Sequence, residues 1–253
     1  MTPLVIAFAM YSRIPMPRVE WNEKNMRYAM CFFPVIGIVI AAAEYLCFFL
    51  CGKLALGTMF CSILLVLIPI LITGGIHMDG FMDTMDALSS HAERERKLEI
   101  LKDSHTGAFA ILGCCVYLLA AAAVWSEVTE DMLLAILPGF VISRALSGIA
   151  VVSWKSARKN GLLYTFADGA DKIVVRTVLA VCLAAAAVFT IGMGGIAGAA
   201  AVAAAALVFL YYRLMSLHQF GGITGDLAGY FLQLCELAIP LAVVLAVRIG
   251  GVL

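Results

Sequence analysis

Apolar runs of about 20 residues recur along the whole chain and are separated by short polar segments. Wound as an α-helix, a run of that length crosses a hydrocarbon core of roughly 30 Å. The pattern therefore predicts an all-α polytopic integral membrane protein that forms one domain over residues 1–253. About seven transmembrane helices are expected, at residues 27–50, 57–74, 107–125, 131–152, 173–191, 195–214 and 228–248.

The N-terminal segment is apolar but too short to cross a bilayer. It begins at Met1 and has no basic residue before Arg13, so it fits neither a cleaved signal peptide nor a full span. We expect a short interfacial or re-entrant helix there. The tract 192–206 is rich in alanine and glycine, whose small side chains allow helix backbones to approach closely.

Composition and charge narrow the class of protein further. Of the 253 residues, 63% are hydrophobic and 13% are charged, which excludes an ordinary water-soluble domain. Lys and Arg together equal Asp and Glu together at 17 each, so no net charge favours nucleic acid as a partner. The expected partner is the lipid bilayer, and a homo-oligomer is left open.

The basic residues are distributed unevenly between the two sets of alternating loops. By the positive-inside rule, the set with more Lys and Arg is cytoplasmic. The poorer set holds only Lys53 and Arg248. The richer set holds Arg13, Arg18, Lys24, Arg27, Arg94, Arg96, Lys97, Lys102, Lys155, Arg158, Lys159, Lys172, Arg176 and Arg213.

An acidic stripe follows the second predicted span. Asp79, Asp83 and Asp86 stand at positions i, i+4 and i+7, so on a helix their carboxylates project from one face. Like charges repel unless a cation neutralises them, and hard oxygen ligands suit Mg²⁺ or Mn²⁺, which can bridge to the phosphates of a substrate. The stripe predicts a Mg²⁺ site, with Asp83 also a catalytic candidate. The alternative is a solvated acidic face at a helix start.

Two glycines and a histidine precede this stripe. Gly74 and Gly75 permit backbone geometry in which amides reach a phosphate, so both are candidate substrate-binding residues. His77 is a candidate for orienting a phosphate or for proton transfer, with a structural hydrogen bond as the alternative. The four histidines show no zinc-binding spacing.

A charged segment and a second polar cluster lie before the third predicted span. Residues 92–101 alternate in charge and predict a solvated helix. The cluster 102–107 reads Lys-Asp-Ser-His-Thr-Gly. Asp103 is a further candidate metal ligand and catalytic carboxylate, and Lys102 a candidate phosphate contact. A cap at a membrane-entry turn is the alternative for Asp103.

A third polar cluster, residues 220–226, reads Phe-Gly-Gly-Ile-Thr-Gly-Asp and precedes the last predicted span. Glycines around a threonine and an aspartate at a helix entrance suit an anion or metal-phosphate site, although a plain turn with an N-cap fits equally well. The cluster supplies Asp226 as a catalytic candidate, and Gly221, Gly222, Thr224 and Gly225 as substrate-binding candidates.

Three ionisable residues, Glu44, Arg144 and Glu236, lie inside predicted spans. A charge is expensive there, so each is either a functional candidate or a partner for another charge. We take Arg144 as a candidate substrate-binding residue, with mutual pairing inside the bundle as the alternative.

The three motifs occur in the order G-G-x-H-x-D-G-x-x-D-x-x-D, K-D-S-x-x-G and G-G-x-T-G-D, and together they resemble the cobalamin synthase family, also called adenosylcobinamide-GDP ribazoletransferase. Ser12 to Pro17 (S-R-I-P-M-P), Phe33 to Gly37 (F-P-V-I-G) and Ser143-Arg144 match as well, so the resemblance spans nearly the whole chain. The sequence departs from the family pattern at Ala87, His105 and Ile223, where Gly, Arg and Gln are common.

The resemblance implies a Mg²⁺-dependent transferase of the prokaryotic cytoplasmic membrane, with its active site on the cytoplasmic side. Its substrates would be adenosylcobinamide-GDP and α-ribazole or α-ribazole 5′-phosphate, and its products adenosylcobalamin or its phosphate and GMP. A CDP-alcohol phosphotransferase is the nearest alternative, but its D-G-x-x-A-R element is missing after Asp79-Gly80. A metal or corrinoid transporter is a further alternative.

Overall fold

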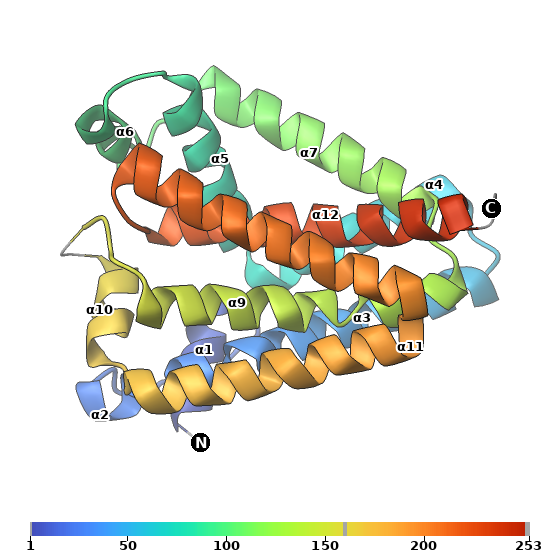
Figure 1. Cartoon of the computed structure of the whole chain (residues 1–253), viewed down its shortest axis with the longest axis horizontal. Coiled ribbons are helices and arrows are strands. Elements are labelled where there is room, and N and C mark those ends of the chain that lie inside the picture. Colours follow the sequence, from blue (N-terminus) through green and yellow to red (C-terminus); the bar gives the residue numbers. More distant parts are fainter. Residues whose placement is uncertain (1, 159–160, 251–253) are drawn as a thin grey trace.

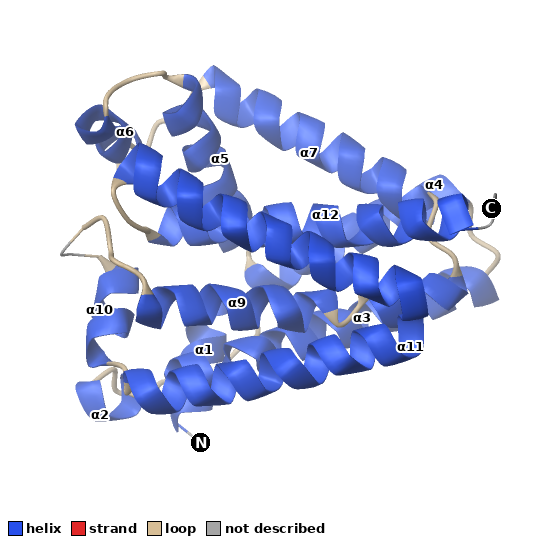
Figure 2. Cartoon of the chain, in the orientation of Figure 1, coloured by secondary structure: helices blue, strands red, loops and turns tan. Residues whose placement is uncertain are grey.

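The computed structural model describes residues 2–158 and 161–250, and most of these residues are helical (Figures 1 and 2). In this part of the chain the only β-type pairing is an isolated bridge between Ser156 and Ile223, so the predicted all-α class is confirmed. The helices are α1 (Thr2–Tyr11), α2 (Glu23–Met26), α3 (Phe33–Lys53), α4 (Thr58–Thr73), α5 (Ile76–Ser89), α6 (Arg94–Ile100), α7 (Ala108–Ser126), α8 (Leu133–Ile136), α9 (Gly139–Ser153), α10 (Leu162–Gly169), α11 (Lys172–Met215) and α12 (Gly225–Gly250), with single turns η1 (Ala29–Phe32), η2 (Glu130–Met132) and η3 (Ser216–Phe220).

Candidate spans number five among the described residues, or six when the bent pair α4 and α5 counts as one span. The count is consistent with a membrane protein, but the seven predicted spans are not confirmed. Helix α11 contains the predicted segments 173–191 and 195–214 in one element, and it doubles back at Gly195, where the backbone leaves helical geometry at φ 54° and ψ −126° (Figure 1). The predicted N-terminal helix is present as α1.

The glycine pair between α4 and α5 forms a turn. Gly74 and Gly75 both have left-handed backbones, with φ of 67° and 80°, which side chains rarely adopt. The turn bends the chain by 97°. A Cβ on Gly74 would also lie 2.4 Å from Cγ of Arg13, so a larger residue there would displace this side chain.

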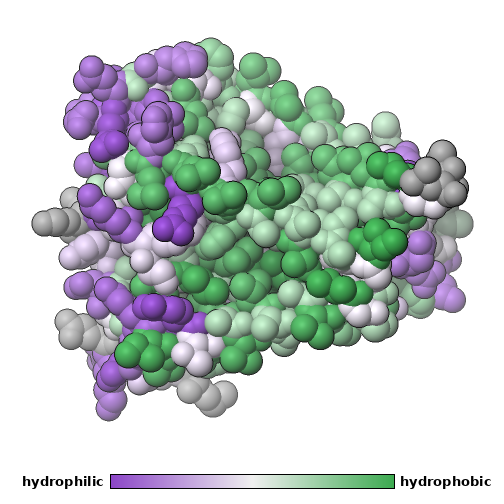
Figure 3. Space-filling model, in the orientation of Figure 1, coloured by the Kyte–Doolittle hydropathy of each residue, from purple (hydrophilic) through white to green (hydrophobic). Residues whose placement is uncertain are grey.

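Hydrophilic residues gather at the end of the bundle that carries α2, α6 and α10, and a broad hydrophobic band covers the middle (Figures 1 and 3). A smaller hydrophilic group lies at the opposite end, near the C-terminus of α12. The predicted solvated helix is present as α6 at the larger polar end. Lys159, counted above among the cytoplasmic residues, lies outside the described residues.

Candidate active site

Helices α5 and α12 cross with their backbones in contact. A Cβ on Gly80 would lie 2.7 Å from the carbonyl oxygen of Asp226, and one on Gly229 would lie 2.9 Å from the carbonyl oxygen of His77. Side chains at either position would hold the helices apart. The two glycines therefore bring the acidic motif of α5 against the late glycine-rich motif, about 140 residues further along the chain.

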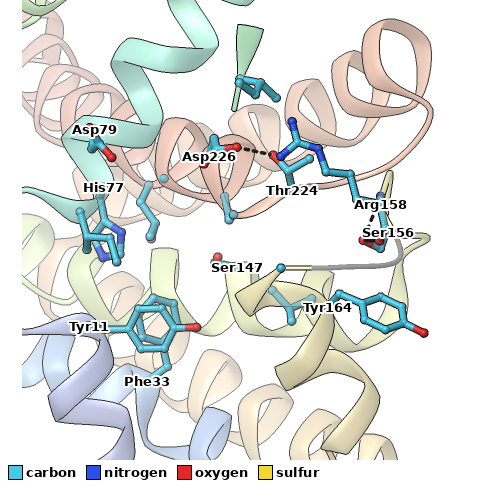
Figure 4. Close-up of a pocket in the computed structure, with 18 of the residues that line it drawn as sticks. Tyr11, Phe33, His77, Asp79, Ser147, Ser156, Arg158, Tyr164, Thr224 and Asp226 are labelled. Atoms are coloured by element: carbon cyan, nitrogen blue, oxygen red, sulfur yellow. Dashed lines mark hydrogen bonds between the residues drawn. The ribbon is translucent and has the colours of Figure 1, made fainter. Parts of the chain in front are cut away.

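A cavity of about 300 Å³ lies beside this crossing. Its wall includes His77 and Asp79 from α5, Asp226 from the first turn of α12, Ser147 from α9 and Arg158 from the loop after α9 (Figure 4). The side chains of Asp79 and Asp226 lie along one side of the cavity in this view, and those of Tyr11 and Phe33 lie on the other. One side is thus acidic and the other aromatic.

The carboxylates of the two helices act on one another. Asp83 lies one turn beyond Asp79, is partly buried, and experiences the negative charges of Asp79, Asp86 and Asp226. Asp226 in turn experiences the charge of Asp79. Like charges held this close favour a cation between them.

The donor chemistry of this side of the cavity fits Mg²⁺. Among residues 2–158 and 161–250 no three His, Cys, Asp or Glu side chains converge closely enough to hold a metal by themselves. Magnesium, however, is usually held by one or two carboxylates together with water and substrate phosphates, rather than by a cage of protein ligands. Asp79 and Asp226, which both line the cavity, meet that requirement.

Asp86, the last member of the predicted stripe, caps a neighbouring helix. Its Oδ2 accepts the N–H of Gly107 at 2.6 Å and its Oδ1 accepts the N–H of Ala110 at 2.8 Å. Gly107 precedes α7 and has no side chain that could cap it, so Asp86 satisfies these amides from α5. The arrangement explains why a glycine ends the 102–107 cluster: a Cβ there would lie 2.5 Å from Oδ2 of Asp86.

The structure does not bring the other predicted residues of the 102–107 cluster to the cavity. Lys102 and Asp103 are exposed. Asp103 accepts the backbone N–H of His105 at 3.0 Å and lies 2.7 Å from Nδ1 of the same histidine. These hydrogen bonds lower the pKa of Asp103. The metal and catalytic roles of Asp103 stay predictions, as does the phosphate contact of Lys102.

In the late motif, Thr224 caps α12. Its hydroxyl oxygen accepts the N–H of Leu227 at 3.3 Å, and the hydroxyl donates to Oδ2 of Asp226 at 3.3 Å. Asp226 is therefore not the cap of this helix, and its carboxylate faces the cavity (Figure 4). Thr224 and Gly225 also line the cavity, in agreement with their selection from the sequence.

Gly221 and Gly222 shape the approach to this motif. Gly221 is left-handed, with φ 75°, and lies against Arg94 of α6. A Cβ on Gly222 would lie 2.5 Å from the carbonyl oxygen of Lys155. The two segments are joined by hydrogen bonds, from N–H of Ile223 to O of Lys155 and from N–H of Ala157 to O of Ile223, both 2.9 Å long.

This pairing of loops carries Arg158, which the sequence indicated only as a marker of sidedness, into the cavity wall. Its Nη2 donates to the carbonyl oxygen of Leu98. Its Nε is buried and has no hydrogen-bond partner within the described residues. Burial lowers the pKa of Arg158, and the nearby Asp226 carboxylate raises it. A guanidinium that still has an unpartnered N–H is suited to bind an anion.

Two of the three ionisable residues inside the predicted spans form a buried pair. Arg144 is fully buried and donates from Nη1 to Oε1 of Glu236 at 2.9 Å and to the carbonyl oxygen of Phe140 at 3.0 Å. Arg144 thus pairs with another charge inside the bundle, which was the alternative to a substrate-binding role. Arg144 is not among the residues that line the cavity. Glu44 is also fully buried, with no hydrogen-bond partner within the described residues.

The matches to known proteins all indicate one family. A family model described as cobalamin-5-phosphate synthase matches residues 3–244. The chain is 48% identical to adenosylcobinamide-GDP ribazoletransferase of Lachnoclostridium phytofermentans, over 96% of this chain and 93% of the relative. It is 33% identical to the protein of the same name from Clostridium perfringens, over 91% and 92%, and 34% identical to that of Treponema denticola, over 94% and 96%. No solved structure matches the chain.

Proposed function

Because the chain belongs to the cobalamin-5-phosphate synthase family, and is thus a transferase of cobalamin biosynthesis, we propose that it transfers adenosylcobinamide phosphate from adenosylcobinamide-GDP. The acceptor is α-ribazole or its 5′-phosphate, the other product is GMP, and the reaction depends on Mg²⁺. The single observation that carries this proposal is the crossing of α5 and α12, which places Asp226 and Asp79 at the wall of one cavity, with the charge of Asp83 close behind them on α5.

The reaction is a phosphoryl transfer. A ribose hydroxyl of the acceptor attacks the phosphorus attached to cobinamide and forms a new P–O bond. The anhydride P–O bond breaks, and its electron pair leaves with GMP. Such a transfer needs aligned reactants and stabilisation of charge on the phosphate oxygens, with little covalent help from the protein.

Asp79 and Asp226 would hold Mg²⁺, with Asp83 contributing its charge from the next turn of α5. When bound, the metal neutralises and orients the pyrophosphate oxygens of the donor. The proton of the acceptor hydroxyl passes to one of these carboxylates or to His77, which lines the same cavity. We place Arg158 on the leaving phosphate, because Arg158 lines the cavity, its Nε has no hydrogen-bond partner within the described residues, and the Asp226 carboxylate acts on its guanidinium.

The membrane sets the approach of the substrates. Adenosylcobinamide-GDP and α-ribazole would reach the cavity from the polar end of the bundle. We propose that this end is cytoplasmic because basic residues lie in and beside α2, α6 and α10, which are found there (Figure 1). Apolar helix surfaces near this end would support the large corrinoid, which the cavity of about 300 Å³ cannot enclose.

The test is reconstitution of the purified chain in lipid nanodiscs with adenosylcobinamide-GDP, α-ribazole and Mg²⁺. Mass spectrometry should detect a corrinoid product containing the ribazole and an equal amount of GMP. Omission of α-ribazole, and replacement of Mg²⁺ by EDTA, should each abolish both products. GMP release without a joined corrinoid product would indicate a hydrolase and contradict the proposal.

A further inference from the structure

The side of the cavity away from the carboxylates is an aromatic pocket with few polar groups. The rings of Tyr11 and Phe33 have centroids 4.4 Å apart, and the His77 ring lies 6.3 Å from the first and 6.0 Å from the second. Met30 and Val151 add apolar surface to the same cavity. Flat ligands with a delocalised ring stack well on such surfaces.

The polar atoms of this aromatic pocket lack strong partners. Nε2 of His77 is buried and makes no hydrogen bond within the described residues. Among the described residues, the Tyr11 hydroxyl donates only to the thioether sulfur of Met30, at 3.6 Å, and a thioether is a weak acceptor. The Ser147 hydroxyl points toward the cavity (Figure 4). Buried polar groups are normally satisfied, so a ligand with one or two polar ring atoms would complete this pocket.

We infer that the aromatic pocket formed by Tyr11, Phe33, His77 and Ser147 binds the aromatic base of the acceptor nucleoside. This inference rests on the proposed function, whose acceptor is α-ribazole. The base stacks on Tyr11, and a free ring nitrogen meets Nε2 of His77 or the Ser147 hydroxyl. His77 and Asp79 are two residues apart on α5 and line one cavity, so the ribose of this nucleoside lies next to the carboxylates that hold the phosphates.

The guanine of the donor is the other flat base in the reaction, and it fits this pocket less well. Guanine presents several donors and acceptors along its edge. The aromatic pocket offers few polar groups and no carboxylate, because the acids of the cavity lie on its other side (Figure 4). The guanosine is also joined to the phosphate that we place at Arg158. The pocket is therefore assigned to the acceptor.

Calorimetric titration of the purified chain in nanodiscs with α-ribazole alone, and separately with GDP and Mg²⁺, tests this assignment without turnover. Tyr11→Ala should weaken α-ribazole binding at least about fivefold, the lower range for loss of base stacking on an aromatic ring. Tyr11→Phe keeps the ring and should lose less affinity than Tyr11→Ala. GDP binding should be unchanged in both variants. Tyr45→Ala, at an exposed tyrosine of α3, is the matched control and should change neither affinity.

A second variant avoids the loss of packing that Tyr11→Ala could cause. Ser147→Val keeps the neighbouring rings and fills space in the cavity, so it should raise KM for α-ribazole at least about fivefold and leave KM for adenosylcobinamide-GDP unchanged. Absence of α-ribazole binding to the wild type would overturn the assignment. So would selective loss of GDP binding in Tyr11→Ala, or equal effects on both KM values in Ser147→Val. Each of the last two results would leave the transferase proposal standing, since the wild-type reaction tests that separately.

Discussion

The carbonyl oxygen of Asp226 lies so close to Gly80 that a Cβ on that glycine would come within 2.7 Å of it. The atoms of Asp226 that face Gly80 belong to the backbone, so they cannot rotate away as a side chain would. The contact ties the D-G of the early motif to the G-D of the late one, and it makes the acidic group of the cavity depend on a glycine that itself has no chemistry.

Gly80→Ala should therefore separate α5 from α12. Overpacking of this kind costs about 1–3 kcal/mol of stability, and the displaced Asp226 should lower turnover at least about tenfold. Thermal unfolding and initial rates measure the two effects. Gly192→Ala is the control, because a Cβ there meets nothing within 4 Å on helix α11, and alanine favours a helix over glycine. Equal stability and equal turnover of Gly80→Ala and Gly192→Ala would argue against the close crossing of α5 and α12.

Asp86→Ala should destabilise the protein by about 1–2 kcal/mol, because the amides of Gly107 and Ala110 would lose their acceptor. Asp86→Asn keeps one acceptor oxygen and should lose less. The measurement is the thermal midpoint, accompanied by the Mg²⁺ concentration for half-maximal activity. An unchanged midpoint with a large increase in the Mg²⁺ requirement would show instead that Asp86 is a metal ligand, as the spacing of the stripe predicted.

Sidedness can be tested by labelling single cysteines in a cysteine-free background. Glu93, at the start of α6, and Glu130, in η2, are both exposed and lie near opposite ends of the bundle. A cysteine at Glu93 should react with an impermeant maleimide only from the cytoplasmic side, and one at Glu130 only from outside. A cysteine at Lys159 should behave like that at Glu93. Reaction of Glu93 and Glu130 variants from one side would contradict the proposed orientation.

The sequence allowed most helices to be predicted, because long apolar runs and glycine turns are local signals. The seven predicted spans are not confirmed, although the bends at Gly74 and Gly195 lie at boundaries of predicted spans. Asp79 and Asp226 were both selected from the sequence as site candidates. The role of Asp86 at the start of α7 was not expected, because it arises only when α5 and α7 meet.

Arg158 escaped sequence reasoning for a similar reason. It belongs to a basic loop, and nothing near it in sequence resembles a site. Its place in the cavity wall comes from the hydrogen bonds that join Lys155 and Ala157 to Ile223, nearly 70 residues away. The aromatic pocket is likewise assembled from α1, the start of α3, α5 and α9. Apart from His77, the residues that form it are typical of ordinary membrane packing when taken alone.

The most direct test of the account compares turnover and thermal stability in Asp226→Ala, Asp83→Asn and Asp171→Ala. Asp171 is the control, because it caps α11 by accepting the N–H of Val174 at 3.2 Å and pairs with Arg27, but does not line the cavity. We expect Asp171→Ala to lose about 1 kcal/mol of stability and to keep its turnover. Asp226→Ala and Asp83→Asn should remain folded and lose at least about two orders of magnitude in turnover. Near-wild-type turnover of both at saturating Mg²⁺ would contradict a catalytic site formed by α5 and α12.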